Sequence, residues 1–136
     1  MILKLSDVRD WLKTLELGTD NFYIGKLDNK KDKSIGVYQL RNNHVNVAIG
    51  GLDNTKTLEK SVSILIHWNM NAKETEEKAL ELYYKLLNAK EFKINNIKIN
   101  YIKLLVSEPV DVGTDDKNIY ERVIEATFYY EKGAEE

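Results

Sequence analysis

The chain has 136 residues, 43% hydrophobic and 31% charged, and this composition predicts a single globular domain over residues 1–136. It contains no cysteine, which excludes a disulfide framework and a thiolate metal site. The formal net charge of −2 lacks the basic surplus typical of nucleic-acid binding, so we expect no specific nucleic acid as a partner. Since no apolar run is long enough for a signal peptide or a membrane span, we expect a soluble intracellular protein without a membrane partner.

The N-terminal third predicts one helix followed by strands. Ser6 is a favourable N-cap, and apolar residues at helical spacing continue to about Leu17, just before the helix-ending Gly18. Alternating apolar side chains predict three strands, over residues 22–24, 35–40 and 45–49. The polar run 28–33 is expected to form the solvated tip of a hairpin between the first two strands.

The middle of the chain contains the clearest strand and a second helix. Residues 61–69 alternate, with both faces largely apolar or aromatic, which predicts a central strand. Asn71 is the expected N-cap of the helix, Glu74 completes a capping-box pattern, and the helix should run to about Ala89. Its predicted apolar stripe comprises Ala79, Leu80, Tyr83, Leu86 and Leu87.

The last third predicts three more strands. Asn95 and Asn96 are typical of a tight turn between a short strand and a longer one. The apolar phase switches between Tyr101 and Ile102, which indicates a β-bulge or a strand buried on both faces. A polar loop is expected over 109–118, then a long strand over 119–131, and finally a frayed tail at about 132–136.

These elements predict an α+β fold, in which a single, mostly antiparallel sheet carries two helices on one face. The expected order is α-β-β-β-β-α-β-β-β. No glycine-rich phosphate loop follows a strand, so the sequence does not support a doubly wound nucleotide-binding sheet.

Candidate chemical groups are few. Of the two histidines, His67 lies in the central strand, where a hydrogen-bonded structural imidazole is favoured over a metal ligand or a catalytic base. Asp111, Asp115 and Asp116 surround Gly113. They suit turn geometry, an acidic contact surface for a basic partner, or a weak Ca²⁺ site, and we favour turn geometry over Ca²⁺. We therefore predict no catalytic, cofactor-binding or metal site.

The lysines of the expected hairpin tip form a small basic patch. Lys30, Lys31 and Lys33 are interrupted by Asp32 and preceded by Asn29. Contact with phosphate is one interpretation of this patch. A mobile charged loop is the favoured one.

Several local patterns together resemble a known family. They are the opening helix followed by residues 23–28 and 35–38, the apolar strand 62–68 running into the helix 72–87, and the stretch 109–123, with its proline, small loop, Gly-Thr-Asp and final strand. The chain is similar in these respects to the minor capsid or tail-terminator proteins, the tail-completion proteins of long-tailed phages and prophages.

This resemblance implies a structural protein without a cofactor. Members assemble as a homo-oligomeric ring, commonly a hexamer, at the head-proximal end of the tail. There they contact the tail-tube protein and the head–tail connector, so the expected location is the host cytoplasm during assembly and then the virion. The candidate contact residues are Asn29, Lys30, Lys31, Asp32, Lys33, Asp111, Asp115 and Asp116. Two alternatives remain: a small α+β ligand- or protein-binding regulatory module and, less favoured, an enzyme.

Overall fold

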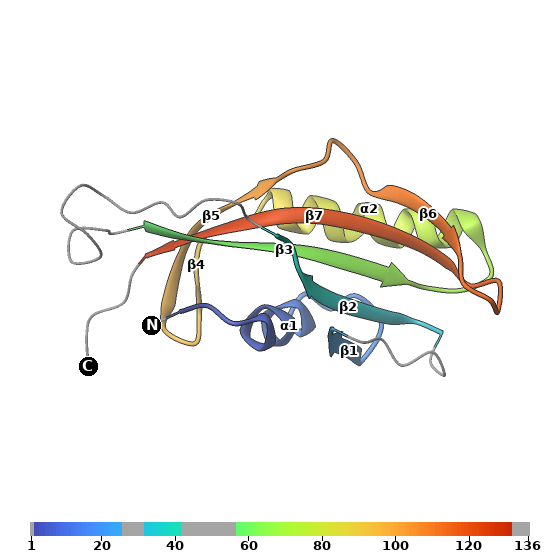
Figure 1. Cartoon of the computed structure of the whole chain (residues 1–136), viewed down its shortest axis with the longest axis horizontal. Coiled ribbons are helices and arrows are strands. Elements are labelled where there is room, and N and C mark those ends of the chain that lie inside the picture. Colours follow the sequence, from blue (N-terminus) through green and yellow to red (C-terminus); the bar gives the residue numbers. More distant parts are fainter. Residues whose placement is uncertain (1, 26–31, 42–56, 132–136) are drawn as a thin grey trace.

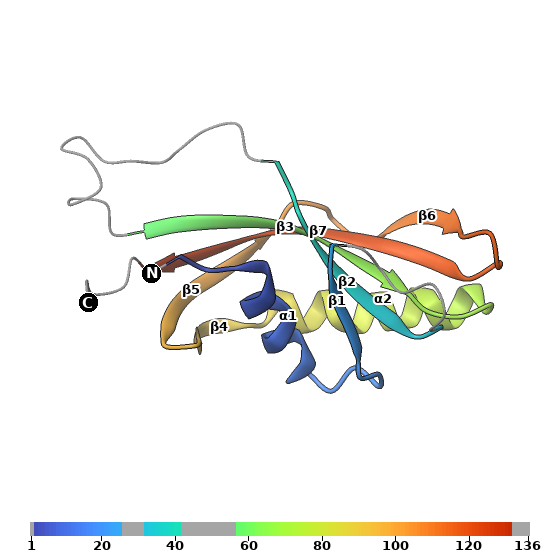
Figure 2. The same cartoon turned by 60° about the horizontal axis from the view of Figure 1, so that its bottom comes forward.

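The computed structural model describes residues 2–25, 32–41 and 57–131. Within them the elements are α1 (Leu5–Lys13), β1 (Asn21–Ile24), β2 (Ser34–Gln39), β3 (Thr57–His67), α2 (Ala72–Leu87), β4 (Lys90–Ile94), β5 (Ile97–Leu104), β6 (Val110–Thr114) and β7 (Tyr120–Glu131). The strands form one long, curled sheet, and both helices lie on the same side of it (Figures 1 and 2). The predicted α+β class, with its mostly antiparallel sheet, is therefore confirmed. Neither described helix has the length and apolar composition needed to cross a membrane.

Two long strands form the centre of the sheet. The strand order is β1-β2-β3-β7-β5-β4, and β3 pairs with β7 from Thr57 opposite Glu131 to His67 opposite Glu121. On the other side of β7, β5 pairs with its C-terminal half and β6 with its N-terminal end. The predicted central position of β3 is confirmed, although the strand begins four residues earlier than expected.

The predicted hairpin between the first two strands is wrong, because β1 and β2 run parallel. Asn21 lies opposite Ser34, and this register brings the buried side chains of Phe22 and Ile35 side by side. Gly25 turns the chain out of β1 with a φ of 68°, and its N–H donates to the carbonyl of Val37 at 2.9 Å. The expected strand 45–49 and the expected contact residues 29–31 lie outside the described part of the chain.

The core lies between the sheet and the two helices. The ring of Trp11 on α1 stacks on Phe92 of β4, with centroids 4.5 Å apart, and meets Phe128 of β7 edge-on at 5.8 Å. The inward side chains of β3 and β7 are fully buried or nearly so: Val62, Ile64, Ile66, Ile124, Ala126, Phe128 and Tyr130. The opposite face of these strands is more polar, and Ser61 and Thr127 share a hydrogen bond there at 2.9 Å. Burial on one face thus fixes the register of the two central strands.

The first helix begins earlier than predicted. Lys4, and not Ser6, is the N-cap, and its backbone N–H donates to Oδ2 of Asp7 at 2.9 Å. Asp7 is the third residue of the helix, and its carboxylate caps the N-cap backbone in place of a serine side chain. Ser6 therefore lies inside the first turn. The helix ends at Lys13, and the chain then turns through Glu16 and Gly18, both with positive φ.

The second helix begins as predicted, but its apolar stripe is shifted. The side chain of Asn71 accepts a hydrogen bond from the N–H of Glu74 at 3.1 Å, which confirms the N-cap. Leu82 is fully buried, whereas Leu87, predicted to face the core, is 49% exposed. The buried positions are Thr75, Ala79, Leu82 and Leu86. These positions recur at helical spacing on one side of the helix, which leaves Leu87 at the edge of that side.

The hairpin of β4 and β5 is confirmed together with its bulge. Asn95 and Asn96 have φ values of 48° and 66°, as a two-residue turn requires. The register against β7 shifts between Ile99 and Tyr101, so that Ile102 returns to the buried face. The side-chain amide of Asn95 donates to Oδ1 of Asp7 at 2.6 Å, which fixes the turn against α1.

Two leucines on α2 test this arrangement. We expect Leu82→Ala to lower the free energy of unfolding by about 2–5 kcal/mol, because it leaves a cavity in the core. Leu87→Ala, the matched control, should change it by less than about 0.5 kcal/mol. Urea unfolding followed by circular dichroism measures both, and equal losses would contradict the described helix orientation.

Candidate functional site

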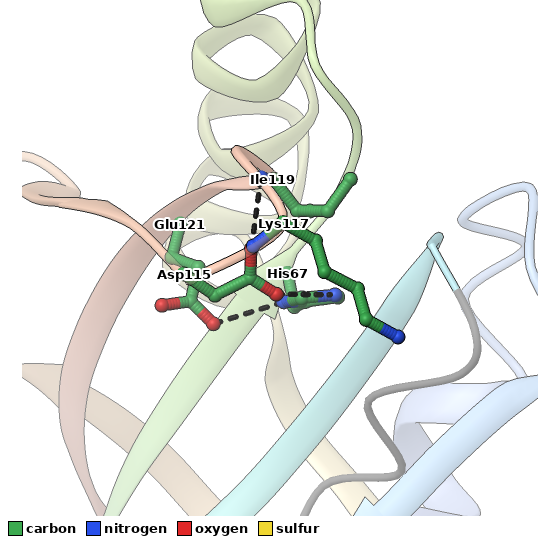
Figure 3. Close-up of polar contacts among 5 residues, drawn as sticks. All are labelled: His67, Asp115, Lys117, Ile119 and Glu121. Atoms are coloured by element: carbon green, nitrogen blue, oxygen red, sulfur yellow. Dashed lines mark hydrogen bonds and ion pairs between the residues drawn. The ribbon is translucent and has the colours of Figure 1, made fainter.

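The residues that join β6 to β7 form a tight turn at one end of the sheet (Figure 3). Oδ1 of Asp115 accepts hydrogen bonds from the backbone N–H groups of Lys117 and Ile119, both at 2.9 Å. The N–H of Asn118 donates to the carbonyl of Asp115 at 3.1 Å, and Asn118 has a φ of 64°. Ile119 is buried and anchors the turn to the sheet. The turn is therefore closed by an aspartate side chain that replaces backbone partners.

His67, the last residue of β3, lies against this turn. Its side chain is 1% exposed, and Nδ1 lies 2.9 Å from Oε2 of Glu121, its neighbour across the β3–β7 ladder. Nε2 points toward Oδ2 of Asp115 at 3.7 Å, and both of these buried atoms lack a hydrogen-bond partner within the described residues (Figure 3). The imidazole thus lies between two carboxylates, one on β7 and one in the turn. The predicted hydrogen-bond partner of the imidazole is confirmed, and it is Glu121.

Asp115 is held in its charged form. Burial alone would raise the pKa of its carboxyl group, but the N–H groups of Ile119 and Lys117 and the nearby His67 outweigh burial and lower the pKa below the usual 3.8. Two backbone donors on one oxygen favour the carboxylate strongly. The ionised side chain therefore stabilises the turn at neutral pH.

The three candidate aspartates have different roles. Asp111 lies in β6 and not in a loop as predicted, because residues 110–114 pair with the start of β7. Its Oδ1 accepts the N–H of Gly113 at 2.9 Å, within a bulge that gives Gly113 a φ of 91°. Asp116 is exposed to solvent beside the half-buried Asp115. Within the described residues no group of three or more histidines and acids can hold a metal ion, and these contacts match the turn-geometry interpretation.

The two described residues of the expected hairpin tip lie at the same end of the sheet. Nζ of Lys33 lies 5.5 Å from the ring centre of Trp68, and Nζ of Lys78 lies 5.2 Å from it. The N–H of Trp68 donates to the carbonyl of Tyr120, the first residue after the turn. Asp32 is exposed. The two candidate loops are separate in the sequence, and the structure brings both near Trp68: Lys33 lies over its ring, and the backbone N–H of Trp68 binds the end of the turn.

A second charged feature was not singled out from the sequence. The β4–β5 hairpin carries Lys90, Lys93, Lys98 and Lys103, all exposed, against the single acid Glu91. The excess of lysine over residues 90–104 could have indicated this basic surface. The same residues also fit an ordinary pair of strands, so the lysines did not stand out. This hairpin pairs with the far half of β7, away from the acidic turn (Figure 1).

Substitution of Asp115 tests the role of the turn. We expect Asp115→Ala to lower the free energy of unfolding by about 1–3 kcal/mol, because two N–H groups lose a charged acceptor. Asp115→Asn, which keeps an acceptor oxygen, should cost less. Asp116→Ala is the matched control and should have almost no effect. Chemical unfolding measures all three, and an equal cost for Asp115→Ala and Asp116→Ala would contradict the described hydrogen bonds.

The lowered pKa of Asp115 predicts that the stability of the fold depends on pH in the acidic range. A carboxyl group whose pKa is lower in the folded state stabilises the fold above its unfolded pKa of about 3.9, and this contribution is lost as the pH falls through the folded value. The stability advantage of the wild type over Asp115→Asn should therefore shrink as the pH falls from about 5 toward 3. Urea midpoints at several pH values measure this difference, and an advantage that grows with acid would contradict the sign.

Comparison with known proteins places this architecture. No curated protein matches the chain. The family described as bacteriophage tail terminator protein matches residues 6–132, a range that runs from α1 to the end of β7. Because the match covers nearly the whole sequence, the chain belongs to the bacteriophage tail terminator family and is a structural phage tail protein.

Proposed function

We propose that this protein is the tail terminator of a long-tailed phage or prophage. In this role it assembles as a homo-oligomeric ring, most simply a hexamer, on the head-proximal end of the tail tube and joins the tail to the head connector. The family match over residues 6–132 is the observation that carries the proposal.

The shape and charge of the subunit support ring formation. A closed ring needs a heterologous interface, in which two different patches of one subunit meet. The described chain has two such patches of opposite sign, the acidic turn beside His67 and the lysine-rich β4–β5 hairpin. They belong to opposite ends of the same sheet, as a repeating head-to-tail contact requires (Figure 1).

The partners follow from the proposed place in the virion. One rim of the ring contacts the last ring of the tail-tube protein, and the other rim contacts the connector at the base of the head. The subunit is made in the host cytoplasm and becomes part of the virion when a tail is completed. Its action is contact and blockage of further tube growth, without a chemical step.

Assembly with tail tubes tests the proposal. Purified protein added to polymerising tail-tube protein should shorten the tubes and appear as a ring on one end in negative-stain electron micrographs. Tubes already capped should then bind purified connector, whereas uncapped tubes should not. Leu87→Ala serves as a folded control variant for the binding steps, because it truncates an exposed side chain. Failure of the folded protein to bind either tubes or connector would overturn the proposal. A monomer in isolation would not, since the tube end can template the ring.

A further inference from the structure

We infer that neighbouring subunits meet end to end, with the lysine-rich hairpin of one copy against the acidic turn of the next. The basic hairpin is defined as residues 90–104 and the acidic turn region as residues 108–121. This inference rests on the proposed ring and names the two surfaces that build it.

The two patches are opposite in charge. The basic hairpin contains four lysines and one glutamate, which gives a formal charge of +3. The acidic turn region contains Lys117 as its only basic residue and a formal charge of −4. Its five acids are Glu108, Asp111, Asp115, Asp116 and Glu121. Although the total charge of the chain is only −2, positive and negative charge are thus concentrated in two different regions.

The distance between the patches is set by β7. The hairpin tip at Asn95 and Asn96 lies beyond the C-terminal end of β7, because Ile99, the third residue of β5, pairs with Tyr130. The turn at 115–119 leads directly into the N-terminal end of β7. A strand of 12 residues spans roughly 40 Å. The near edges of the two patches approach each other beside the middle of β7, where Lys103 lies opposite Thr127 and Val110 opposite Val123. The hairpin tip, however, cannot reach the turn at 115–119 of its own subunit, and both are available to another copy.

The basic hairpin has an unfavourable arrangement when the subunit is alone. Lys93 lies directly opposite Lys98 across the β4–β5 ladder, and like charges at such positions destabilise a sheet. Lys98 reaches Glu131 at 3.6 Å, but Lys90, Lys93 and Lys103 form no ion pair within the described residues. An acidic neighbour would remove this repulsion. The hydrogen bond from Asn95 to Asp7 already holds the tip in position.

The acidic turn region exposes acidic side chains that are not used within the subunit. Glu108 and Asp116 are exposed and form no ion pair with any other described residue. Next to them on β6, the side chains of Val110 and Val112 are 45% and 49% exposed, and no described strand pairs with the outer edge of β6. The patch therefore combines acids with a small apolar surface, a mixture typical of interfaces.

A second copy of this chain is the occupant that the charges favour. Each patch repels an identical patch, which disfavours a two-fold dimer through either of them, and each attracts the other. Head-to-tail contact between different patches is the pattern that produces a ring. A nucleic acid on the basic hairpin, or an unrelated basic protein on the acidic turn, is the competing explanation.

Paired charge reversals give the main test. One variant carries Lys93→Glu and Lys98→Glu, and the other carries Glu108→Lys and Asp116→Lys. The first variant changes the basic hairpin from +3 to −1, and the second changes the acidic turn region from −4 to 0. On tail-tube ends, each variant alone should need at least about tenfold more protein for ring formation, because the interface becomes repulsive in the first case and loses its attraction in the second. An equimolar mixture should lower this requirement again, since half of the interfaces in an alternating ring keep the wild-type charges and the other half place the exchanged charges opposite each other.

A matched control and a second readout complete the design. Arg9→Glu with Lys13→Glu on α1 lowers the net charge by four, as the basic-hairpin variant does, but outside both patches. It should leave ring formation unchanged, with thermal unfolding used to verify each fold. Because the chain has no cysteine, Lys93→Cys with Asp116→Cys should give a ladder of disulfide-linked oligomers under oxidation. Either cysteine alone should give no ladder.

The outcomes separate this inference from the proposed function. If wild-type rings form and both charge-reversal variants form them equally well, the inference is overturned and the proposed function stands. If the basic-hairpin variant keeps its rings but loses binding to duplex DNA, the hairpin is a nucleic-acid contact and the inference is likewise overturned. If the wild type caps no tubes and joins no connector, the proposed function fails and this inference fails with it.

Discussion

The pairing of β3 with β7 is the constraint on which the rest of the structure depends. Eleven consecutive residue pairs join the two strands, from Thr57 opposite Glu131 to His67 opposite Glu121. This ladder supplies the apolar face that both helices cover, and it determines where the sheet ends. Because β7 is longer than either β5 or β6, two separate segments share its other edge. The length of one strand thus separates the acidic turn from the basic hairpin.

The sequence predicted most of this framework because the relevant signals are local. The Asn71 cap, the Asn95–Asn96 turn and the bulge near Tyr101 each depend on neighbouring residues, and all are present. The parallel pairing of β1 with β2 was missed, because strand direction depends on tertiary contacts and the polar residues between two short strands favour a hairpin. The position of Leu87 was missed because helical spacing alone does not fix how the helix rotates on the sheet.

The candidate site was predictable only in part. The acidic residues 111–116 were recognised as a group, and His67 was recognised separately as a structural imidazole. Their contact depends on the β3–β7 register, which places Glu121 opposite His67 and brings the turn over both. An alternating pattern in a strand gives its faces but not its partner or its register. The repulsion between Lys93 and Lys98 could not be predicted either, because it depends on the β4–β5 register that places them opposite each other.

The contact between His67 and Asp115 explains how a charged end can also be a rigid one. An exposed acidic loop loses conformational entropy when it binds, and this loss weakens the contact. Here one oxygen of Asp115 closes the turn through two backbone N–H groups, while the other faces a buried imidazole at the end of the longest ladder. The turn is therefore ordered before any partner arrives, and Asp116 remains exposed at its surface. At the opposite end, the hydrogen bond from Asn95 to Asp7 holds the tip of the basic hairpin against α1. Two preorganised ends of opposite charge, held about 40 Å apart by one strand, suit a subunit that must repeat the same contact around a ring.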